Sequence, residues 1–320
     1  MAPHLIVVEG LPGSGKSTLS QSLMLAYSAS GCETRWYSEL EVDHPLAYVY
    51  RPDRDRTLDE YVTACRTRWQ HFLDDCARET ERTVIVDAWL LQDPVFSMLL
   101  ANVERRQIVD IMSELWRLVP RASSAVLYLT QRDVPAAVEH FCASRGPRMR
   151  SFYVERNDRS AFAEARGVSG PAGLNRFWTE HREICDAILT DVAPNRIDKD
   201  VSARNWPSVT AEVLAAFDLE LPWRNEDDLE RFTGSYRLDE TAATFDVIER
   251  EGRLLLRGFP FFWRDADQEL LPLGSGLFAV QSWPATVRFE VRAGVACSLD
   301  VTEQHRCGQA PWPAGSYART

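Results

Sequence analysis

The stretch VVEGLPGSGKSTL, residues 7–19, constrains the fold of this 320-residue chain more than any other feature. A short apolar run comes first, a loop with three glycines follows, and Lys16-Ser17 opens a segment with helical character. Glycines in this spacing let successive backbone N–H groups converge on one anion. The stretch matches the Walker A pattern, Gly10-x-x-x-x-Gly15-Lys16-Ser17, and predicts a phosphate-binding turn between a buried parallel strand and a helix.

Each part of this loop suits one part of a nucleoside triphosphate. The backbone N–H groups and the positive end of the helix attract phosphate oxygens, Lys16 neutralises the β and γ phosphates, and the Ser17 hydroxyl binds Mg²⁺. We therefore expect ATP and Mg²⁺ as cofactors. The residues expected to bind the nucleotide are Gly10, Leu11, Pro12, Gly13, Ser14, Gly15, Lys16, Ser17 and Thr18.

A second residue of the phosphate site is expected at the end of a neighbouring buried strand. The run TVIVDAW places Asp87 there, in the Walker B position. A carboxylate at this point binds Mg²⁺ directly or through water, or acts as a base. An aspartate that ends a strand is also a common turn residue. Given the glycine-rich loop, the metal or catalytic role is the favoured interpretation.

Residues 5 to about 217 alternate between short apolar runs and longer helical patterns, as a parallel sheet with crossover helices requires. One amphipathic helix is expected over 57–80, with Thr57 and Glu60 in capping-box spacing. The expected strands are LIVVE, TRWYSE, RTVIVD, SAVLYLT and a weaker NRID. The fold class predicted for this part is α/β, a P-loop parallel sheet flanked by helices.

The pattern changes after Leu219, where seven short alternating runs follow one another with Gly, Asp, Pro or Asn between them. This pattern predicts a small antiparallel β barrel or sandwich. We place the P-loop domain at 1–218, a linker at 219–230 and the β domain at 231–320. Acceptor recognition, dimerisation and contact with a partner protein are its candidate roles. One aromatic group is interpreted as core, with a docking patch as the alternative: Phe259, Phe261, Phe262 and Trp263.

Composition narrows the class of partner and compartment. The chain has 36 Lys and Arg against 47 Asp and Glu, a net charge of −11, which argues against a broad basic face for nucleic acid. The N-terminal apolar run is interrupted by Glu9 and no run approaches eighteen apolar residues, so neither a signal peptide nor a membrane span is expected. Seven scattered cysteines without a C-x-x-C pair are expected to be reduced thiols in the cytoplasm.

The loop VVEGLPGSGKSTL resembles the EGxxGxGKST opening of thymidylate kinases and related nucleoside and nucleotide kinases. The order of elements is similar over roughly the first 215 residues. QRDVPAAVEHFCASRG resembles the segment that leads into the arginine-rich lid of these kinases, here about 143–170. NRIDKDVSARNWPSVTAEVLAAF resembles their closing strand and helix, whose loop borders the base of ATP. The β domain loosely resembles the lipocalin-like domain at the C-terminus of some β-lactamase-like serine hydrolases.

Arginines of the lid segment are candidates to close over the transferred phosphate. Guanidinium groups on a mobile segment stabilise the charge of the transferring phosphoryl group and help to exclude water. Arg145 and Arg148 are the first candidates and Arg150 is the next. Arg156 and Arg159 are interpreted as solvated surface residues.

The acceptor is expected at the carboxyl ends of the second and third strands, facing the glycine-rich loop. Glu39 ends the second strand where related deoxynucleoside kinases keep their base, and Asp87 is the competing base. Glu41, Asp43 and His44 follow, either as acceptor contacts or as solvated and turn residues. Nearby aromatic residues are expected either to stack on a ring or to form core: Trp36, Tyr37, Tyr48, Tyr50, Trp69 and Trp89.

Departures from the thymidylate kinase pattern bear on the acceptor. No Arg-Glu-Pro follows Glu39, and Asp87-Ala88-Trp89 stands in place of Asp-Arg. An acidic acceptor region repels an anionic phosphate, so a neutral or cationic hydroxyl compound is favoured over a nucleoside monophosphate. No N-K-x-D motif of GTPase switches is present, and Ala88 replaces the glutamate of motor ATPases.

The sequence thus predicts an enzyme, an ATP-dependent kinase that phosphorylates a small hydroxyl-bearing molecule with Mg²⁺. The proposed catalytic residues are Lys16, Asp87, Glu39, Arg145 and Arg148, and the proposed metal ligands are Ser17 and Asp87. A nucleoside or nucleotide kinase is the first alternative, and a nucleotide-dependent regulatory module is the second. A homodimer is compatible with all three functions. We expect neither nucleic acid nor a membrane as a partner.

Overall fold

The computed structural model describes residues 3–52, 57–223, 226, 228–238, 243–258, 267–303 and 315–320. The chain divides into two compact units. The first unit consists of Met1–Glu39 and Asp43–Glu220, and the second of Leu40–Val42 and Leu221–Thr320.

A five-stranded parallel sheet forms the centre of the first unit, in the order β2-β3-β1-β4-β5. The strands are β1 (Leu5–Gly10), β2 (Glu33–Tyr37), β3 (Arg82–Asp87), β4 (Ser124–Thr130) and β5 (Arg196–Asp200). Because β1 lies between β3 and β4, the glycine-rich loop that follows β1 lies at the middle of the carboxyl edge of the sheet. Asp87 ends β3, the strand directly beside it.

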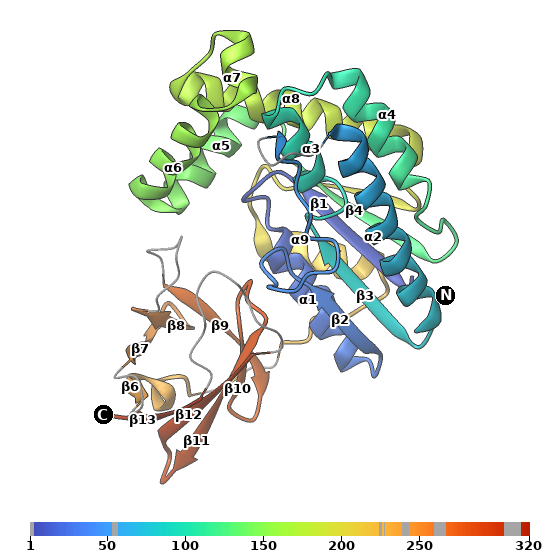
Figure 1. Cartoon of the computed structure of the whole chain (residues 1–320). Helices are drawn as coiled ribbons and strands as arrows, with labels where there is room; N and C mark the ends of the chain where they lie inside the picture. Colours follow the sequence, from blue (N-terminus) through green and yellow to red (C-terminus); the bar gives the residue numbers. More distant parts are fainter. Residues whose placement is uncertain are drawn as a thin grey trace. The chain divides into compact units, whose positions relative to one another are not determined.

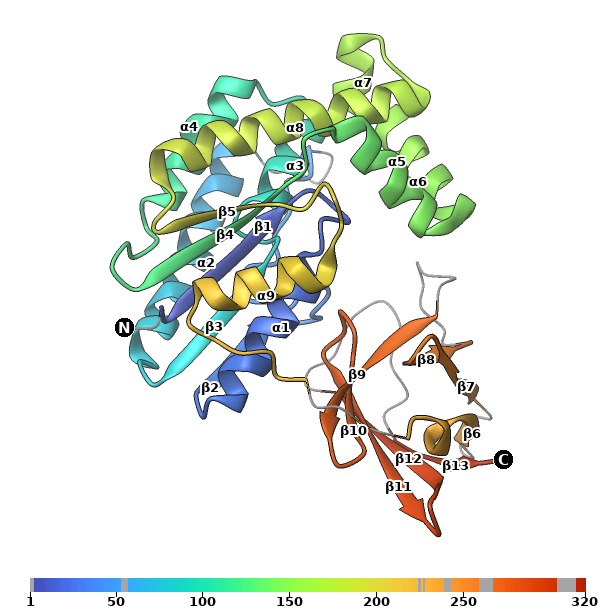
Figure 2. The same ribbon diagram turned by 180° about the vertical axis from the view of Figure 1, so that it is seen from behind.

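Helices cover both faces of this sheet, which explains why β1 is apolar from Leu5 to Val8. Leu5 and Val7 belong to one buried cluster, and Ile6 and Val8 belong to another on the opposite face. Figures 1 and 2 show α1 and α9 on one side of the sheet and α2, α3, α4 and α8 on the other. These helices are α1 (Lys16–Ala29), α2 (Leu58–Arg78), α3 (Gln92–Leu100), α4 (Arg105–Trp116), α8 (Gly170–Val192) and α9 (Trp206–Ala216).

Helix α2 confirms the predicted capping box. The Thr57 hydroxyl accepts a hydrogen bond from the Glu60 backbone N–H (3.2 Å), and the Glu60 carboxylate accepts one from the Thr57 N–H (2.8 Å). Two backbone N–H groups that the helix itself cannot pair are satisfied in this way.

The segment expected to form a lid is helical. It includes the end of α5 (Val134–Ser144), all of α6 (Gly146–Asp158) and α7 (Ala161–Arg166), and it leads into α8. Figures 1 and 2 show α5, α6 and α7 together at one end of the first unit.

The second unit contains a closed antiparallel barrel in the order β10-β11-β12-β13-β6-β7-β8-β9, preceded by the short helix η2 (Glu230–Phe232). The strands are β6 (Gly234–Leu238), β7 (Ala243–Arg250), β8 (Arg253–Arg257), β9 (Gln268–Gly274), β10 (Leu277–Val280), β11 (Ala285–Arg292), β12 (Val295–Glu303) and β13 (Gly315–Arg319). The fold-class prediction is confirmed for both units, and the second unit is a barrel and not a sandwich. The sequence patterns missed β13, which closes it.

Aromatic side chains fill the barrel. The rings of Phe232, Phe278 and Phe289 contact one another, and the Tyr236 hydroxyl donates a hydrogen bond to the Phe232 carbonyl (2.7 Å). All four residues are buried. In the part of the barrel that the structure describes, the interior is therefore a packed core like that of other small barrels.

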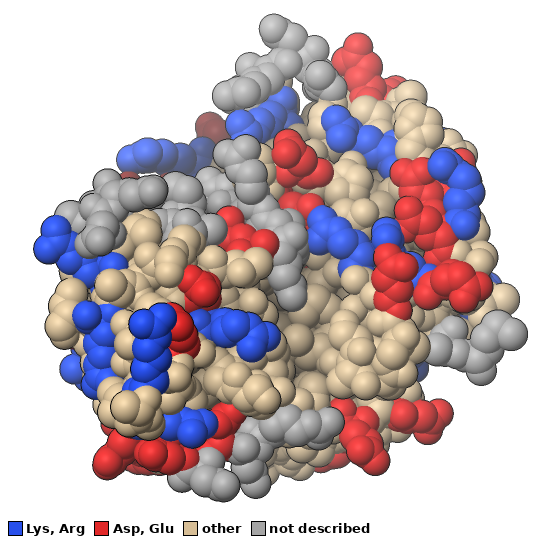
Figure 3. All heavy atoms as spheres, turned by 90° about the horizontal axis from the view of Figure 1, so that it is seen from below, with Lys and Arg blue, Asp and Glu red and all other residues tan. Residues whose placement is uncertain are grey.

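The aromatic group at 259–263 that was considered as a docking patch lies outside the described residues. On the face drawn in Figure 3, basic and acidic side chains are interspersed. No helix in the described part of the chain has both the length and the apolar character needed to span a membrane.

Candidate active site

The turn between β1 and α1 depends on two glycines. Gly10 has a φ of 151° and Gly15 a φ of 89°. A Cβ atom on Gly10 would lie 2.6 Å from the Leu129 carbonyl oxygen, and one on Gly15 would lie 2.5 Å from the Trp206 ring. Both distances are far below van der Waals contact. The loop can pass this close to β4 and α9 only with glycine at both positions.

The N-terminus of α1 is open to an anion. Gly15 is the N-cap residue and supplies no side-chain hydrogen bond, and the first turn has no acidic residue. The N–H groups of this turn lack partners within the helix, and the helix dipole adds partial positive charge there. Such a terminus after a glycine-rich loop favours phosphate.

Lys16, expected to bind the β and γ phosphates, is folded back onto the protein. Its side chain is buried, and its ammonium donates hydrogen bonds to the Leu11 carbonyl (3.2 Å) and to Gln92 Oε1 (2.7 Å). The ammonium thus lies over the glycine-rich loop, between β1 and the start of α3.

Asp87 is fully buried at the end of β3. Its Oδ1 accepts a hydrogen bond from the Glu39 backbone N–H (2.7 Å), while Oδ2 is buried and has no hydrogen-bond partner among the described residues. Burial and the Glu39 carboxylate raise the pKa of Asp87 to about 7, although Ser17 and Lys16 act in the opposite direction. These four residues therefore share one electrostatic environment beside the glycine-rich loop.

A magnesium ion fits this arrangement when a nucleotide is also bound. The orphaned Oδ2 of Asp87 and the neighbouring Ser17 hydroxyl are hard oxygen donors of the kind that Mg²⁺ prefers. The described residues contain no cluster of three or more His, Cys, Asp or Glu that would hold a metal unaided. Phosphate oxygens and water would have to complete the coordination, which is usual for Mg²⁺ in nucleotide sites.

The base candidate Glu39 is positioned by its backbone. Besides the N–H bond to Asp87, its carbonyl accepts a hydrogen bond from the Trp89 indole (3.1 Å). Trp89 reaches back because Ala88 turns the chain with a φ of 70°, an unfavourable value for alanine. The loop after β2 is thereby attached to the end of β3, which brings the two competing base candidates, Glu39 and Asp87, close together.

Gln92 and Asp93, at the start of α3, belong to the site although the sequence analysis did not select them. Gln92 Nε2 donates a hydrogen bond to Asp93 Oδ1 (3.2 Å). Burial and the Glu39 carboxylate raise the pKa of Asp93 to about 8, while Gln92 and Lys16 act to lower it. The available signal was this polar pair inside the apolar run WLLQDPVF, five residues after Asp87.

Glu9, the third residue missed, lies fully buried at the end of β1. Its two carboxylate oxygens accept hydrogen bonds from the backbone N–H groups of Leu90 (3.2 Å) and Gln92 (3.1 Å). Burial raises the pKa of Glu9 to about 8, although Lys16 opposes the shift. Glu9 thus fixes the segment between β3 and α3 against β1.

The lid arginines have separate environments. Arg145 donates a hydrogen bond to the Tyr153 hydroxyl (2.7 Å) and lies over the Phe141 ring. The Glu39 carboxylate contributes to a raised pKa of Tyr153, behind the dominant effect of burial, so this pair lies near the acceptor side. Arg148 is exposed and makes no ion pair with a described residue.

The other three arginines of this segment differ from one another. Arg150 is bound by both oxygens of Glu139 on α5 (2.8 and 2.6 Å), and Arg159 pairs with Glu155 on the surface. Arg156 is exposed, as expected of a surface residue, and its guanidinium also lies 4.7 Å from the centre of the Phe96 ring. Partial burial lowers its pKa and Asp93 raises it, which places its charge beside the site.

The remaining acceptor candidates divide between surface and core. Asp43 is exposed, Glu41 is half-buried, and His44 is buried. His44 Nδ1 accepts a hydrogen bond from the Leu46 N–H (3.1 Å), as in a turn, and its ring contacts Trp89. Two of the aromatic candidates, Trp36 and Trp69, are core residues, and four are half-buried at the margin of the core: Tyr37, Tyr48, Tyr50 and Trp89.

Together these features define the first unit as an α/β domain with a glycine-rich phosphate loop and a buried acidic residue beside it. No protein-family model and no curated protein sequence matches the chain. Solved structures do: 156 chains are similar. One is thymidylate kinase from Candida albicans, with 14% identity and a TM-score of 0.46, covering 68% of this chain and 92% of the other.

Proposed function

We propose that this protein is an ATP-dependent phosphotransferase that uses Mg²⁺ to transfer the γ-phosphate to a small hydroxyl-bearing molecule. One observation carries the proposal. The uncapped N-terminus of α1 and the Lys16 ammonium lie beside Asp87, whose Oδ2 is buried without a hydrogen-bond partner among the described residues. Burying a polar atom in this way costs free energy, and a bound cation would compensate for it.

On the nucleotide side, the loop from Gly10 to Thr18 surrounds the phosphates with backbone N–H groups. Lys16 neutralises the β and γ phosphates, and Ser17 and Asp87 hold Mg²⁺, which offsets the charge that develops on the phosphoryl group. In this assignment the buried oxygen of Asp87 is a ligand of Mg²⁺. Glu39 is therefore the base that accepts the proton of the attacking hydroxyl.

On the acceptor side, the Glu39 carboxylate raises the pKa of both Asp87 and Asp93, and Asp87 also raises the pKa of Asp93. Ala88 occupies the position after Asp87 and offers no cation for a phosphorylated acceptor. Arg156 on α6 interacts electrostatically with Asp93. This balance supports a neutral or cationic alcohol as acceptor and disfavours a nucleoside monophosphate.

Arg145 and Arg148 are proposed to complete the site when α6 closes over bound substrates. Arg148 is exposed and makes no ion pair with a described residue, so it can approach a phosphate without breaking one. Arg145 donates a hydrogen bond to the Tyr153 hydroxyl. Arg150, in contrast, would have to break its ion pair with Glu139.

We also propose a cytoplasmic location, since the cysteines that the structure describes are free thiols.

Turnover tests the proposal. The full-length protein is incubated with Mg²⁺-ATP and pools of alcohols, amino alcohols, sugars, nucleosides and nucleotides, and ADP formation is followed. We expect acceptor-dependent ADP that is lost in Lys16→Ala and retained in Lys199→Ala, the other lysine of the chain, which pairs with Glu212.

Three outcomes separate the alternatives. Activity confined to nucleosides or nucleotides would support the nucleoside or nucleotide kinase. ATP binding without acceptor-stimulated ADP formation would support a regulatory module. Absence of Mg²⁺-dependent binding of any nucleoside triphosphate would refute all three.

A further inference from the structure

Gln92 occupies a fixed position next to the lysine of the glycine-rich loop. It is 4% exposed, and its Oε1 lies 2.7 Å from the Lys16 ammonium nitrogen. Lysine has only N–H donors, so the carboxamide oxygen must face it, and Nε2 then faces Asp93 Oδ1 at 3.2 Å. Both ends of the carboxamide are thus satisfied in only one orientation.

The backbone of Gln92 is held from two directions. Its N–H donates to Glu9 Oε2 (3.1 Å), and its carbonyl lies 3.0 Å from His181 Nε2. Burial lowers the pKa of His181 to about 4, so the ring is neutral near pH 7. Because a carbonyl only accepts, Nε2 must carry the proton of this neutral ring. Gln92 is therefore anchored to β1 and to α8 at once.

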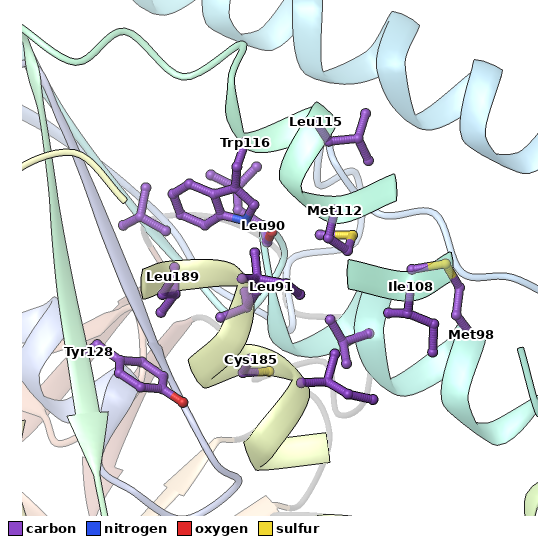
Figure 4. Close-up of a cluster of buried hydrophobic side chains, with 14 of the residues drawn as sticks. Leu90, Leu91, Met98, Ile108, Met112, Leu115, Trp116, Tyr128, Cys185 and Leu189 are labelled. Carbon is purple, nitrogen blue, oxygen red and sulfur yellow. Dashed lines mark hydrogen bonds between the residues drawn. The ribbon is translucent and has the colours of Figure 1, made fainter. Parts of the chain in front are cut away.

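The residues that precede Gln92 are anchored in the hydrophobic core. Leu90 and Leu91 are buried among the side chains drawn in Figure 4, and the Trp116 indole donates a hydrogen bond to the Leu90 carbonyl (2.9 Å). The segment cannot withdraw from the loop without disrupting this packing. If the Lys16 side chain moves toward a bound phosphate, Gln92 therefore remains in its place.

We propose that Gln92 is a positioning residue that holds Lys16 in a resting position and competes with nucleotide phosphate for its ammonium. Oxygen atoms of Gln92 and Leu11 occupy two of the three N–H donors of Lys16. Only one N–H donor remains, so simultaneous contact with the β and γ phosphates must replace at least one of these bonds. The inference rests on the proposed function, because it concerns the same phosphate site.

Two variants of nearly equal length shift this competition in opposite directions. Gln92→Met removes the oxygen that holds Lys16, so Mg²⁺-ADP and Mg²⁺-ATP should bind about ten- to a hundredfold more tightly, the range of one hydrogen bond to a charged group. Gln92→Glu puts a carboxylate against Lys16 and should weaken both by at least about tenfold. If Gln92 had only a structural role, both substitutions would weaken the binding of ADP and ATP.

Titration calorimetry of the full-length protein with ADP and ATP measures these changes. Gln107→Met, on the exposed part of α4, is the matched control and should leave both affinities unchanged. Gln92→Asn, whose shorter side chain does not reach Lys16, should also tighten binding, and it replaces the Met variant if that protein does not fold.

The outcomes separate this inference from the proposed function. The proposed role of Gln92 is overturned if both Gln92→Met and Gln92→Asn bind ADP and ATP no more tightly than the wild-type protein. It is also overturned if Gln92→Glu binds them as tightly as the wild-type protein or more tightly. Acceptor-dependent turnover by the wild-type protein would then still support the kinase. A wild-type protein that binds no nucleotide overturns both.

Discussion

Replacing Glu9 with glutamine should change how the stability of this protein depends on pH. Glu9 is fully buried, and burial raises its pKa from 4.5 to about 8. The unfolded chain releases this proton near pH 4.5, whereas the folded chain keeps it until about pH 8. Between these values folding takes up a proton, so the contribution of Glu9 to stability falls as pH rises.

The size of the effect follows from the proton linkage. One proton changes the free energy of unfolding by about 1.4 kcal/mol per pH unit, or about 2.7 kcal/mol between pH 5.5 and 7.5. In Glu9→Gln that slope is absent. The variant also loses one of the two backbone hydrogen bonds, because an amide NH₂ cannot accept, at a cost of about 1–3 kcal/mol.

We therefore expect Glu9→Gln to be clearly less stable than the wild-type protein at pH 5.5 and close to it, or more stable, at pH 7.5. Urea unfolding of the full-length proteins across this range measures the difference. Asp87 and Asp93 also make the free energy of unfolding fall as pH rises, and His181 makes it rise with pH below pH 6.5. The wild-type protein and Glu9→Gln share these contributions, so they cancel in the difference. The exposed Glu81→Gln is the control. A stability difference that does not change with pH would refute the buried, protonated state of Glu9.

Three further predictions concern the phosphate loop and the lid. Gly15→Ala should destabilise the protein by at least about 1–2 kcal/mol in thermal or urea unfolding, because the backbone is left-handed there and the new methyl group would collide with Trp206. Asp87→Asn can still accept the Glu39 hydrogen bond, so it should fold, and its ATP affinity should become insensitive to Mg²⁺ when titrated with and without EDTA. Arg156→Ala should lower kcat/KM for the acceptor about tenfold, because its charge balances Asp93. Arg159→Ala, three residues further along, should change it less than about twofold, since its ion pair is exposed.

Much of the fold and the phosphate side of the site could be predicted from local patterns. Strand and helix periodicity depends on which side chains face the core, and a glycine-rich turn between a strand and a helix is encoded within about ten residues. This is why the parallel sheet, helix α2 with its capping box, the loop from Gly10 to Ser17 and the position of Asp87 at the end of β3 were all accessible. These features depend on residues that are close together in the sequence.

The partners of those residues depended on tertiary packing. Lys16 meets Gln92 across 76 residues of chain, Gln92 meets His181 across 89, and Gly15 meets Trp206 because α9 returns to β1. Nothing local distinguishes Arg156 from Arg159, since both are exposed arginines at the C-terminal end of the polar helix α6. Only the tertiary structure, which brings Phe96 and Asp93 of α3 close to Arg156, decides which of these two exposed arginines lies beside the site. In the same way, the barrel closes through β13, a short strand without strong alternation that forms because two strands on either side of it offer unpaired backbone groups.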